Sequence, residues 1–153
     1  MIRVISGLYK GKKLRRVSSV KVRPMPNKLK ETLFNIIQER LPDVLFLDGF
    51  AGTGSVGIEA LSRGARTAVF IEELPAAAKV IQDNVAKCGA EEKARIVRKE
   101  FNRAIIQLAK EGARFDVIFL DPPYRLLDER NPLKVIAKRG VVKEGGLIIL
   151  RHF

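Results

Sequence analysis

From residue 44 onward the sequence alternates short apolar runs with amphipathic segments, and this alternation restricts the fold more than any other feature. Five runs have the length of buried strands, at Val44–Leu47, Thr67–Ile71, Ala94–Arg98, Phe115–Leu120 and Gly146–Leu150. Apolar strands separated by helices are typical of a parallel sheet with helices on both faces. The sequence therefore predicts an α/β fold with a doubly wound, mostly parallel sheet.

Helices are expected where amphipathic segments connect these runs. Their expected positions are Ser55–Arg63, Pro75 to about Cys88, about Asn102–Glu111, and a helix opened by Asn131-Pro132. Proline suits the first turn of a helix, where its missing N–H is not needed. An asparagine directly before such a turn can cap the helix with its side chain.

The N-terminal residues do not follow this alternation and are predicted to form a hairpin and a helix. Ile2–Ile5 and Lys13–Val17 flank a turn that contains glycine, which is typical of two short antiparallel strands. Asn27 is expected to cap a helix over about Lys28–Arg40, and Pro42 is expected to end that helix.

The charge is concentrated in this N-terminal part. The chain has 29 Lys and Arg against 17 Asp and Glu, a net charge of +12, and residues 1–40 hold 11 of the basic residues with only two acids. We therefore expect a basic extension at 1–40 and a sheet-forming domain at 41–153. A cationic extension on a nearly balanced body is expected of a protein that binds a polyanion such as nucleic acid. A solubilising surface, or the lysine-rich composition of heat-adapted proteins, would also explain it.

Composition excludes several other classes of protein. Cys88 is the only cysteine and His152 the only histidine, so an intramolecular disulfide and a Cys/His zinc site are excluded, and we expect no metal. No apolar run approaches the ~20 residues of a membrane helix. We expect a soluble cytoplasmic protein that does not bind membranes and, by default, a monomer.

The last expected strand, Gly146–Leu150, lies almost at the end of the chain. A parallel sheet that stops there exposes a flat apolar edge, which natural proteins usually cover. We therefore expect the natural protein or a partner to supply further sheet, so that the domain in this chain lacks its last strands.

A glycine-rich turn follows the first expected strand. Gly52, Gly54 and Gly57 form a G-x-G-x-x-G pattern at a strand–turn–helix junction. Glycines there let the backbone approach a ligand, and a helix N-terminus favours a negatively charged group. The pattern alone is compatible with an oxidoreductase that binds a dinucleotide.

Asp48, which is separated from Gly52 by three residues, makes the turn resemble the first motif of the class I S-adenosylmethionine-dependent methyltransferases. That family has a Rossmann-like fold, and the resemblance implies that the turn passes beneath the amino-acid part of S-adenosyl-L-methionine. The residues it implies in cofactor binding are Asp48, Phe50, Ala51, Gly52, Thr53 and Gly54.

Two acidic residues after later strands also have counterparts in this family. Glu72 lies 20 residues after Gly52, where a carboxylate accepts hydrogen bonds from the ribose hydroxyls of either cofactor. The resemblance implies that Glu100 meets the adenine amino group, with Phe101 beside it. A surface acid at Glu72 and a core residue at Phe101 are the structural alternatives.

The sequence Asp121-Pro122-Pro123-Tyr124 directly follows the fourth expected strand. Two consecutive prolines fix two backbone angles and remove two N–H donors, which leaves a stiff turn with free carbonyl groups. A rigid loop whose Tyr124 covers the sheet is the structural alternative. Ligands of open α/β sheets bind where the strand order reverses, and there the first and fourth strands would be neighbours. We therefore expect the turns after Asp48 and before Tyr124 to share one site.

These four residues resemble the [Asp/Asn]-Pro-Pro-[Tyr/Phe/Trp] signature of methyltransferases that modify planar amino or amide nitrogens. The resemblance implies that Asp121, which would also lie beside the cofactor, and the Pro122 carbonyl accept the two N–H bonds of the target nitrogen. It implies that Tyr124 stacks on the target base. Adenine N6, guanine N2 and protein glutamine are all substrates of enzymes with this signature.

The N-terminal segment indicates which of these substrates is favoured. Arg3 to Leu14, then Arg23-Pro24, then Lys30 to Asn35 resemble the bacterial ribosomal RNA guanine-N2 methyltransferases of the RsmD type, which act on nucleotide 966 of 16S RNA. The RNA contacts that this implies, supported by the charge and by a stacking surface, are Arg3, Tyr9, Lys10, Lys12, Lys13, Arg15 and Arg23. Lys28 and Lys30 differ from the usual residues of that family but keep the positive charge.

Three classes of function follow. The favoured one is guanine-N2 methylation of ribosomal RNA, naked or in a small-subunit assembly particle, with the target base flipped into the site. The second is methylation of DNA adenine or protein glutamine in the same site, and the third is a non-catalytic RNA-binding module. A nicotinamide enzyme ranks last, because it would not need the sequence Asp121 to Tyr124.

Overall fold

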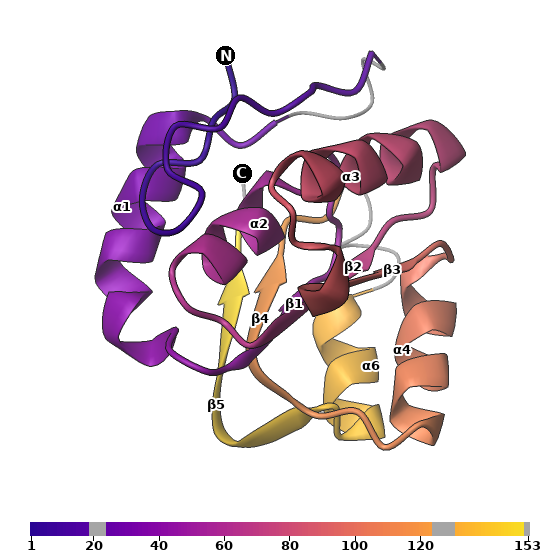
Figure 1. Ribbon diagram of the computed structural model, residues 1–153. Helices are drawn as coiled ribbons and strands as arrows, with labels where there is room; N and C mark the ends of the chain where they lie inside the picture. Colours follow the sequence, from indigo (N-terminus) through magenta and orange to yellow (C-terminus); the bar gives the residue numbers. More distant parts are fainter. Residues whose placement is uncertain (19–23, 124–130, 152–153) are drawn as a thin grey trace.

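The predicted parallel sheet is present in the computed structural model, which describes residues 1–18, 24–123 and 131–151. All the strand pairs are parallel and the order is β3-β2-β1-β4-β5 (Figure 1). The strands are β1 (Leu45–Asp48), β2 (Thr67–Ile71), β3 (Ala94–Val97), β4 (Phe115–Leu120) and β5 (Val142–Leu150). The helices are α1 (Asn27–Ile37), α2 (Ser55–Ser62), α3 (Pro75–Lys87), α4 (Phe101–Lys110) and α6 (Pro132–Arg139). Short 3₁₀ turns are found at Gln38–Arg40 and Glu91–Lys93.

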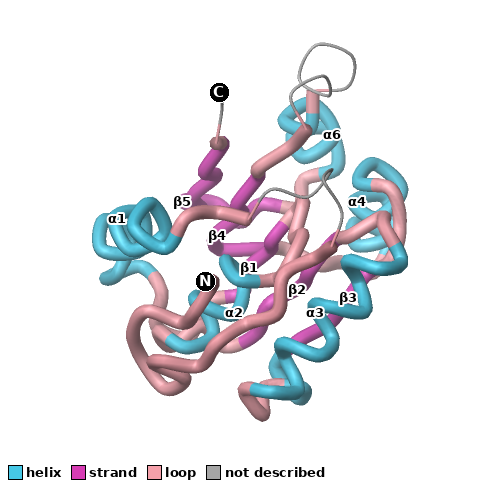
Figure 2. Tube along the Cα trace, turned by 90° about the horizontal axis from the view of Figure 1, so that it is seen from above, coloured by secondary structure: helices cyan, strands magenta, loops and turns pink. Residues whose placement is uncertain are grey.

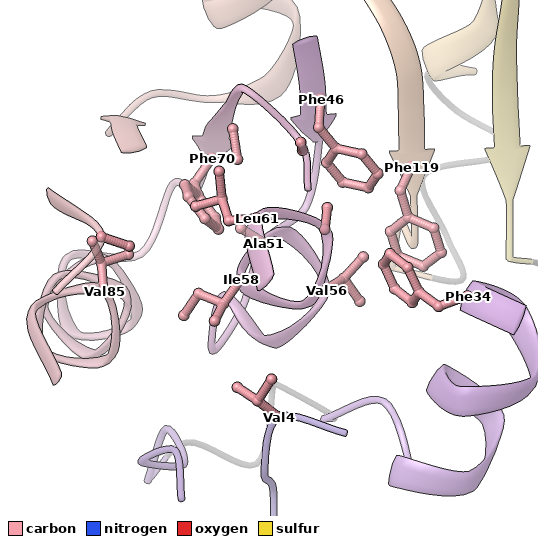
Figure 3. Close-up of a cluster of buried hydrophobic side chains, with 14 of the residues drawn as sticks. Val4, Phe34, Phe46, Ala51, Val56, Ile58, Leu61, Phe70, Val85 and Phe119 are labelled. Atoms are coloured by element: carbon pink, nitrogen blue, oxygen red, sulfur yellow. The ribbon is translucent and has the colours of Figure 1, made fainter. Parts of the chain in front are cut away.

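Helices cover both faces of the sheet, as expected for strands that are apolar on both sides. Alternate residues of each strand face opposite layers, so Phe46 and Phe119 belong to one buried cluster while Leu47 and Leu120 belong to the other. The first cluster lies under α1, α2 and α3, and the second lies under α4 and α6 (Figure 2). Figure 3 shows the first cluster, to which Val4 of the N-terminal segment contributes. The prediction of the fold class is therefore confirmed.

Most of the expected bounds are met to within one residue, but α1 ends at Ile37 and is followed by the 3₁₀ turn Gln38–Arg40, and two further predictions differ from the structure. Strand β5 begins at Val142 rather than Gly146, because Val142 pairs with Phe115 before the register shifts at an irregularity. Asn27 was expected to cap α1, and this is wrong. Asn27 is the first helical residue, and its Oδ1 accepts a hydrogen bond from the Arg3 N–H at 3.3 Å. The cap predicted at Asn131 is confirmed, since its Oδ1 accepts the Leu133 N–H at 2.9 Å.

The N-terminal segment (residues 1–18) turns back on itself as predicted, but the two strands are reduced to a single antiparallel bridge between Arg3 and Lys13. The reason is that residues of both expected strands pair elsewhere: the Ile5 N–H donates to Glu59 Oε1 of α2 at 2.9 Å, and the Arg15 N–H donates to Asn84 Oδ1 of α3 at 2.7 Å. The turn between the strands also binds α2. The Tyr9 N–H donates to Ser62 Oγ at 2.9 Å, and the Leu8 N–H donates to the Ser62 carbonyl at 2.9 Å. A Cβ atom on Gly7 would lie 1.9 Å from that carbonyl oxygen, so only glycine permits this approach.

A buried carboxylate fixes the N-terminal segment to two helices. Glu59 of α2 accepts hydrogen bonds from the N–H groups of Ile5 and Ser6, at 2.9 and 3.1 Å. Its side chain also forms ion pairs with Lys30 of α1 at 3.2 Å and with Arg63 at 2.9 Å. Glu59 and Lys30 are fully buried, and burial lowers the pKa of Lys30 despite the nearby Glu59 carboxylate. The two N–H donors and the two cations compensate for the water that the buried carboxylate has lost, and a buried charge is tolerated only with such partners.

We predict that Glu59→Gln lowers the free energy of unfolding by about 3–5 kcal/mol, because it leaves the buried Lys30 and Arg63 charges without a counter-charge. Urea denaturation followed by circular dichroism measures this loss. The exposed pair between Asp43 and Arg66 is the control, because water screens it, so Asp43→Asn should leave stability unchanged within error. Equal stability of the two variants would contradict this assignment of Glu59.

Candidate active site

The two turns that were expected to share a site follow neighbouring strands. Strands β1 and β4 pair directly, with Asp48 opposite Phe119. The Gly49 N–H then donates to the Phe119 carbonyl at 2.9 Å, which joins the start of the turn after β1 to the end of β4. Asp121, Pro122 and Pro123 follow β4 at the same edge of the sheet. Tyr124 and Arg23 lie outside the described residues.

The glycine loop (residues 49–54) is held by side chains and by close packing. The Gly52 N–H donates to Glu72 Oε1 at 2.8 Å, and the Gly57 N–H donates to Asp48 Oδ2 at 3.0 Å. Gly54 precedes α2 in the left-handed conformation, with φ of 83°. A Cβ atom on Gly57 would lie 2.3 Å from the Phe70 ring, so this glycine lets α2 pack closely on β2. Gly52 also has a positive φ, of 57°, so each glycine of the G-x-G-x-x-G pattern has a structural reason.

Three carboxylates gather at this edge of the sheet, from the ends of β1, β2 and β4. Asp48 is 1% exposed, and burial raises its pKa to about 7, with further increases from the negative charges of Asp121 and Glu72. The pKa of Glu72 is also raised, mainly by burial, although the N–H groups of Leu74 and Gly52 oppose the shift. We call Asp48, Glu72 and Asp121 the acidic cluster. In a chain of net charge +12, such a cluster favours a cationic ligand.

Arg151 belongs to this site and was not singled out in the sequence. It directly follows β5, and its Nη1 pairs with Asp121 Oδ2 at 3.1 Å. Its backbone N–H donates to the Leu120 carbonyl at 2.8 Å, which continues the pairing of β5 with β4. The topology could have indicated this pair, because residues that follow adjacent parallel strands meet at one edge of the sheet.

The residues predicted at the adenine end of the site lie beside the glycine loop. Phe50 stacks on Phe101 with ring centroids 4.6 Å apart, and Phe101 opens α4 as a buried core residue. Glu100 caps α4, with its carboxylate accepting the N–H groups of Asn102 and Arg103 at 2.8 and 3.3 Å. The capping explains Glu100 structurally, and contacts of these residues with adenine stay a prediction.

The basic side chains predicted to contact RNA are mostly on the surface of the N-terminal segment. The exposed members are Arg3, Lys10, Lys12, Lys13 and Arg15. Arg15 pairs with Asp83 of α3, and Tyr9 is half-buried against the first cluster. Lys30, which was expected to keep a positive charge available in this region, is instead buried against Glu59.

Within the described ranges, no group of three or more His, Cys, Asp or Glu side chains is placed to hold a metal ion. In the same part of the chain, no helix has the length and apolar character needed to cross a membrane.

Comparison with known proteins identifies the family. A family model described as Conserved hypothetical protein 95 matches residues 2–153. Ribosomal RNA small subunit methyltransferase D of Haemophilus influenzae is 34% identical over 149 residues, which cover 96% of this chain and 76% of that protein. The Escherichia coli K12 protein of that name is 39% identical over 130 residues, 84% of this chain and 64% of that one. The chain belongs to the ribosomal RNA small subunit methyltransferase D family.

Membership in this family confirms the predicted resemblance and the predicted class of enzyme, a methyltransferase. A solved structure agrees with the fold. A hypothetical protein of Thermus thermophilus has a TM-score of 0.88 and 35% sequence identity, and the match covers 99% of this chain and 86% of that one.

The raised pKa of Asp48 predicts a pH-dependent stability. The ordinary pKa of 3.8 applies in the unfolded chain and a pKa of about 7 in the folded one, so between these values the folded state holds the proton more tightly. The stability of the wild type relative to Asp48→Asn should therefore fall as the pH rises from 4 to 7, by up to about 4 kcal/mol, and then level off. Urea denaturation of both proteins across this pH range measures it.

Asparagine keeps the acceptor for the Gly57 N–H, so Asp48→Asn changes the charge and little else. A stability difference between wild type and Asp48→Asn that stays constant from pH 4 to pH 8 would contradict the assignment.

Proposed function

We propose that this enzyme transfers a methyl group from S-adenosyl-L-methionine to the exocyclic N2 of a guanine in small-subunit ribosomal RNA, nucleotide 966 in the usual 16S numbering. The observation that carries the proposal is that Asp48 ends β1 and Asp121-Pro122-Pro123 directly follows the adjacent strand β4, so that the acidic cluster and this turn lie at the same edge of the sheet. The names of the relatives support ribosomal RNA as the substrate. The family resemblance supports the guanine N2 position.

The residues at the site fit this cofactor. S-adenosyl-L-methionine carries a sulfonium and an ammonium group, and the acidic cluster complements both positive charges. A dinucleotide carries a negatively charged pyrophosphate, which the same carboxylates would repel. Each carboxylate oxygen of Glu72 accepts one hydrogen bond from a backbone N–H, and each keeps a further lone pair that can accept a ribose hydroxyl. Asp48, Phe50, Ala51, Gly52, Thr53, Gly54, Glu72, Glu100, Phe101 and Asp121 would together hold the cofactor.

When bound, the cofactor supplies an activated methyl group, so the protein has mainly to align the target nitrogen. Asp121 and the Pro122 carbonyl accept its two N–H bonds and turn its lone pair toward the methyl group. The carboxylate also stabilises the positive charge that the nitrogen gains during attack. Neither proline has an N–H, so the turn presents acceptors alone from its backbone. Tyr124 would stack on the base, which contributes about 1–3 kcal/mol for such contacts.

The N-terminal segment supplies the contact with the RNA backbone in this proposal. Its exposed basic side chains can neutralise several phosphates, while its buried side chains Ile2, Val4 and Leu14 keep it packed on the domain. Sequence-specific RNA recognition usually targets unpaired bases, which fits a guanine flipped toward Asp121. The enzyme would act in the bacterial cytoplasm as a monomer, on naked RNA or on an assembly particle.

Methyl transfer to defined acceptors tests the proposal. We expect label from S-adenosyl-L-methionine to enter 16S RNA or small subunits, and N2-methylguanosine to appear in the nuclease digest by mass spectrometry. We expect Asp121→Ala to lower turnover by about 100-fold or more, because the nitrogen loses its acceptor, and to weaken cofactor binding far less, because Asp48 and Glu72 of the acidic cluster remain. The control Asp43→Asn should keep full turnover.

Transfer to DNA or release-factor protein instead would favour the second class of function. Binding of both cofactor and RNA with no transfer to any acceptor would favour a non-catalytic RNA-binding module. Calorimetric preference for NAD over S-adenosyl-L-methionine would exclude the proposal, and unchanged turnover of Asp121→Ala would remove that residue from its role.

Charge reversal of the N-terminal segment tests the RNA contact. We expect Lys10, Lys12 and Lys13 changed to Glu to weaken RNA binding and to lower the slope of log Kd against log salt by about 2–3, because three phosphate contacts are lost. Filter binding at several salt concentrations measures both. The matched control reverses Lys110, Lys134 and Lys138, which are exposed on α4 and α6, the layer across the sheet from α1 and α2 (Figure 2). Equal slopes for the two triple variants would contradict the role of this segment.

A further inference from the structure

Asn84 of α3 is a fully buried polar residue that contacts two separate parts of the proposed site. Its Oδ1 accepts the Arg15 N–H at 2.7 Å, and its Nδ2 donates to the Arg15 carbonyl at 3.1 Å. The same Nδ2 donates to the Thr53 carbonyl of the glycine loop at 2.9 Å. Arg15 and Thr53 are both among the residues expected to bind ligands, Arg15 the RNA and Thr53 the cofactor.

These three hydrogen bonds fix the orientation of the Asn84 side-chain amide. Both Nδ2 hydrogens face carbonyl oxygens and Oδ1 faces an N–H, so a flipped amide would place like groups together at every contact. Asn84 is 0% exposed, so water cannot replace a lost partner. A shift of either Arg15 or Thr53 therefore costs hydrogen bonds at Asn84.

On the cofactor side, side chains hold the glycine loop from both directions. Glu72 accepts the Gly52 N–H, and Asn84 donates to the carbonyl of the next residue, Thr53. Gly52 and Thr53 thus lie between a carboxylate that follows β2 and an amide near the end of α3. The position of this dipeptide is set by both contacts.

On the RNA side, Asn84 binds Arg15 in the way that a neighbouring strand would, through its N–H and its carbonyl. The Arg15 side chain pairs with Asp83, the residue before Asn84. Lys12 and Lys13 lie three and two residues before Arg15 on the same segment. Other anchors bind this segment to α1, through Asn27 and Lys30, and to α2, through Glu59 and Ser62. Among the hydrogen bonds of the described residues, none joins the side chains of these four residues to the glycine loop.

We propose that Asn84 is a positioning residue that couples the N-terminal segment to the glycine loop, so that RNA and cofactor each strengthen the binding of the other. The proposal rests on the proposed function, because it needs both ligands. A cofactor bound against the glycine loop restricts the motion of Thr53 further and, through the Asn84 amide, the motion of Arg15. By thermodynamic linkage, RNA bound to the segment strengthens cofactor binding by the same factor.

The test measures binding with no turnover. S-adenosylhomocysteine, which has no methyl group to transfer, is titrated calorimetrically with and without a 16S RNA transcript, and RNA affinity is measured by filter binding with and without S-adenosylhomocysteine. In the wild type we expect each ligand to tighten the other about fivefold or more. In Asn84→Ala we expect both ligands still to bind, but the Kd of each should be unchanged by the other, so that the ratio of Kd values without and with the second ligand is near one.

Ser62→Ala is the matched control. It removes the hydrogen bonds of Ser62 Oγ with the Tyr9 N–H and the Ser6 carbonyl, which anchor the same segment away from the glycine loop. We expect this variant to keep the wild-type ratio, which a merely structural role of Asn84 would not predict. A wild-type ratio in Asn84→Ala, or no coupling in a wild type that binds both ligands, overturns the proposal. A wild type that binds neither ligand removes the proposed function first.

Hydrogen exchange on the wild type gives a second readout in case Asn84→Ala does not fold. S-adenosylhomocysteine should slow exchange of the Arg15 amide, which donates to Asn84 Oδ1, as well as exchange in residues 50–57. Protection of residues 50–57 with no change at Arg15 would overturn the coupling.

Discussion

The arrangement of this molecule depends on the buried carboxylate of Glu59. Its side chain, which is fully buried, accepts hydrogen bonds from the N-terminal segment and pairs with cations on α1 and at the end of α2. Because a buried charge is tolerated only with its partners in place, the basic segment is fixed against the helix that follows the glycine loop. The surface proposed for RNA and the loop proposed for the cofactor are therefore parts of one packed unit (Figure 1).

The order of the strands is the second feature on which the candidate site depends. With the order β3-β2-β1-β4-β5, the ends of β2, β1 and β4 meet at one edge, and all three carry a carboxylate that belongs to the acidic cluster. Burial and the repulsion of Asp121 and Glu72 raise the pKa of Asp48 to about 7, because its charged form is unfavourable in the folded protein without a cation nearby. A site with this excess of negative charge favours a positively charged ligand, and Arg151 offsets part of the charge through its ion pair with Asp121.

The fold could be predicted from the sequence because local pattern and tertiary structure agree. Apolar runs became strands, and Pro75 and Asn131 began helices as expected. The errors arose where long-range contacts decide, as for Asn27, which binds Arg3 instead of capping α1, and for Lys30, whose charge is buried by Glu59. Asn84 was missed for the same reason, since nothing near it in the sequence indicates Thr53, whereas the pair of Arg151 with Asp121 could have been inferred once β5 was placed beside β4.

The ion pair between Arg151 and Asp121 has a consequence for the order in which the protein matures. On the ribosome the N-terminal part of a chain emerges first, so β1, β2 and the glycine loop can assemble while β5 is still being synthesised. Asp121 obtains its pair with Arg151 only when β5 has been added beside β4. A nascent chain can therefore form the half of the site that we propose for the cofactor before the half that we propose for the acceptor nitrogen is complete.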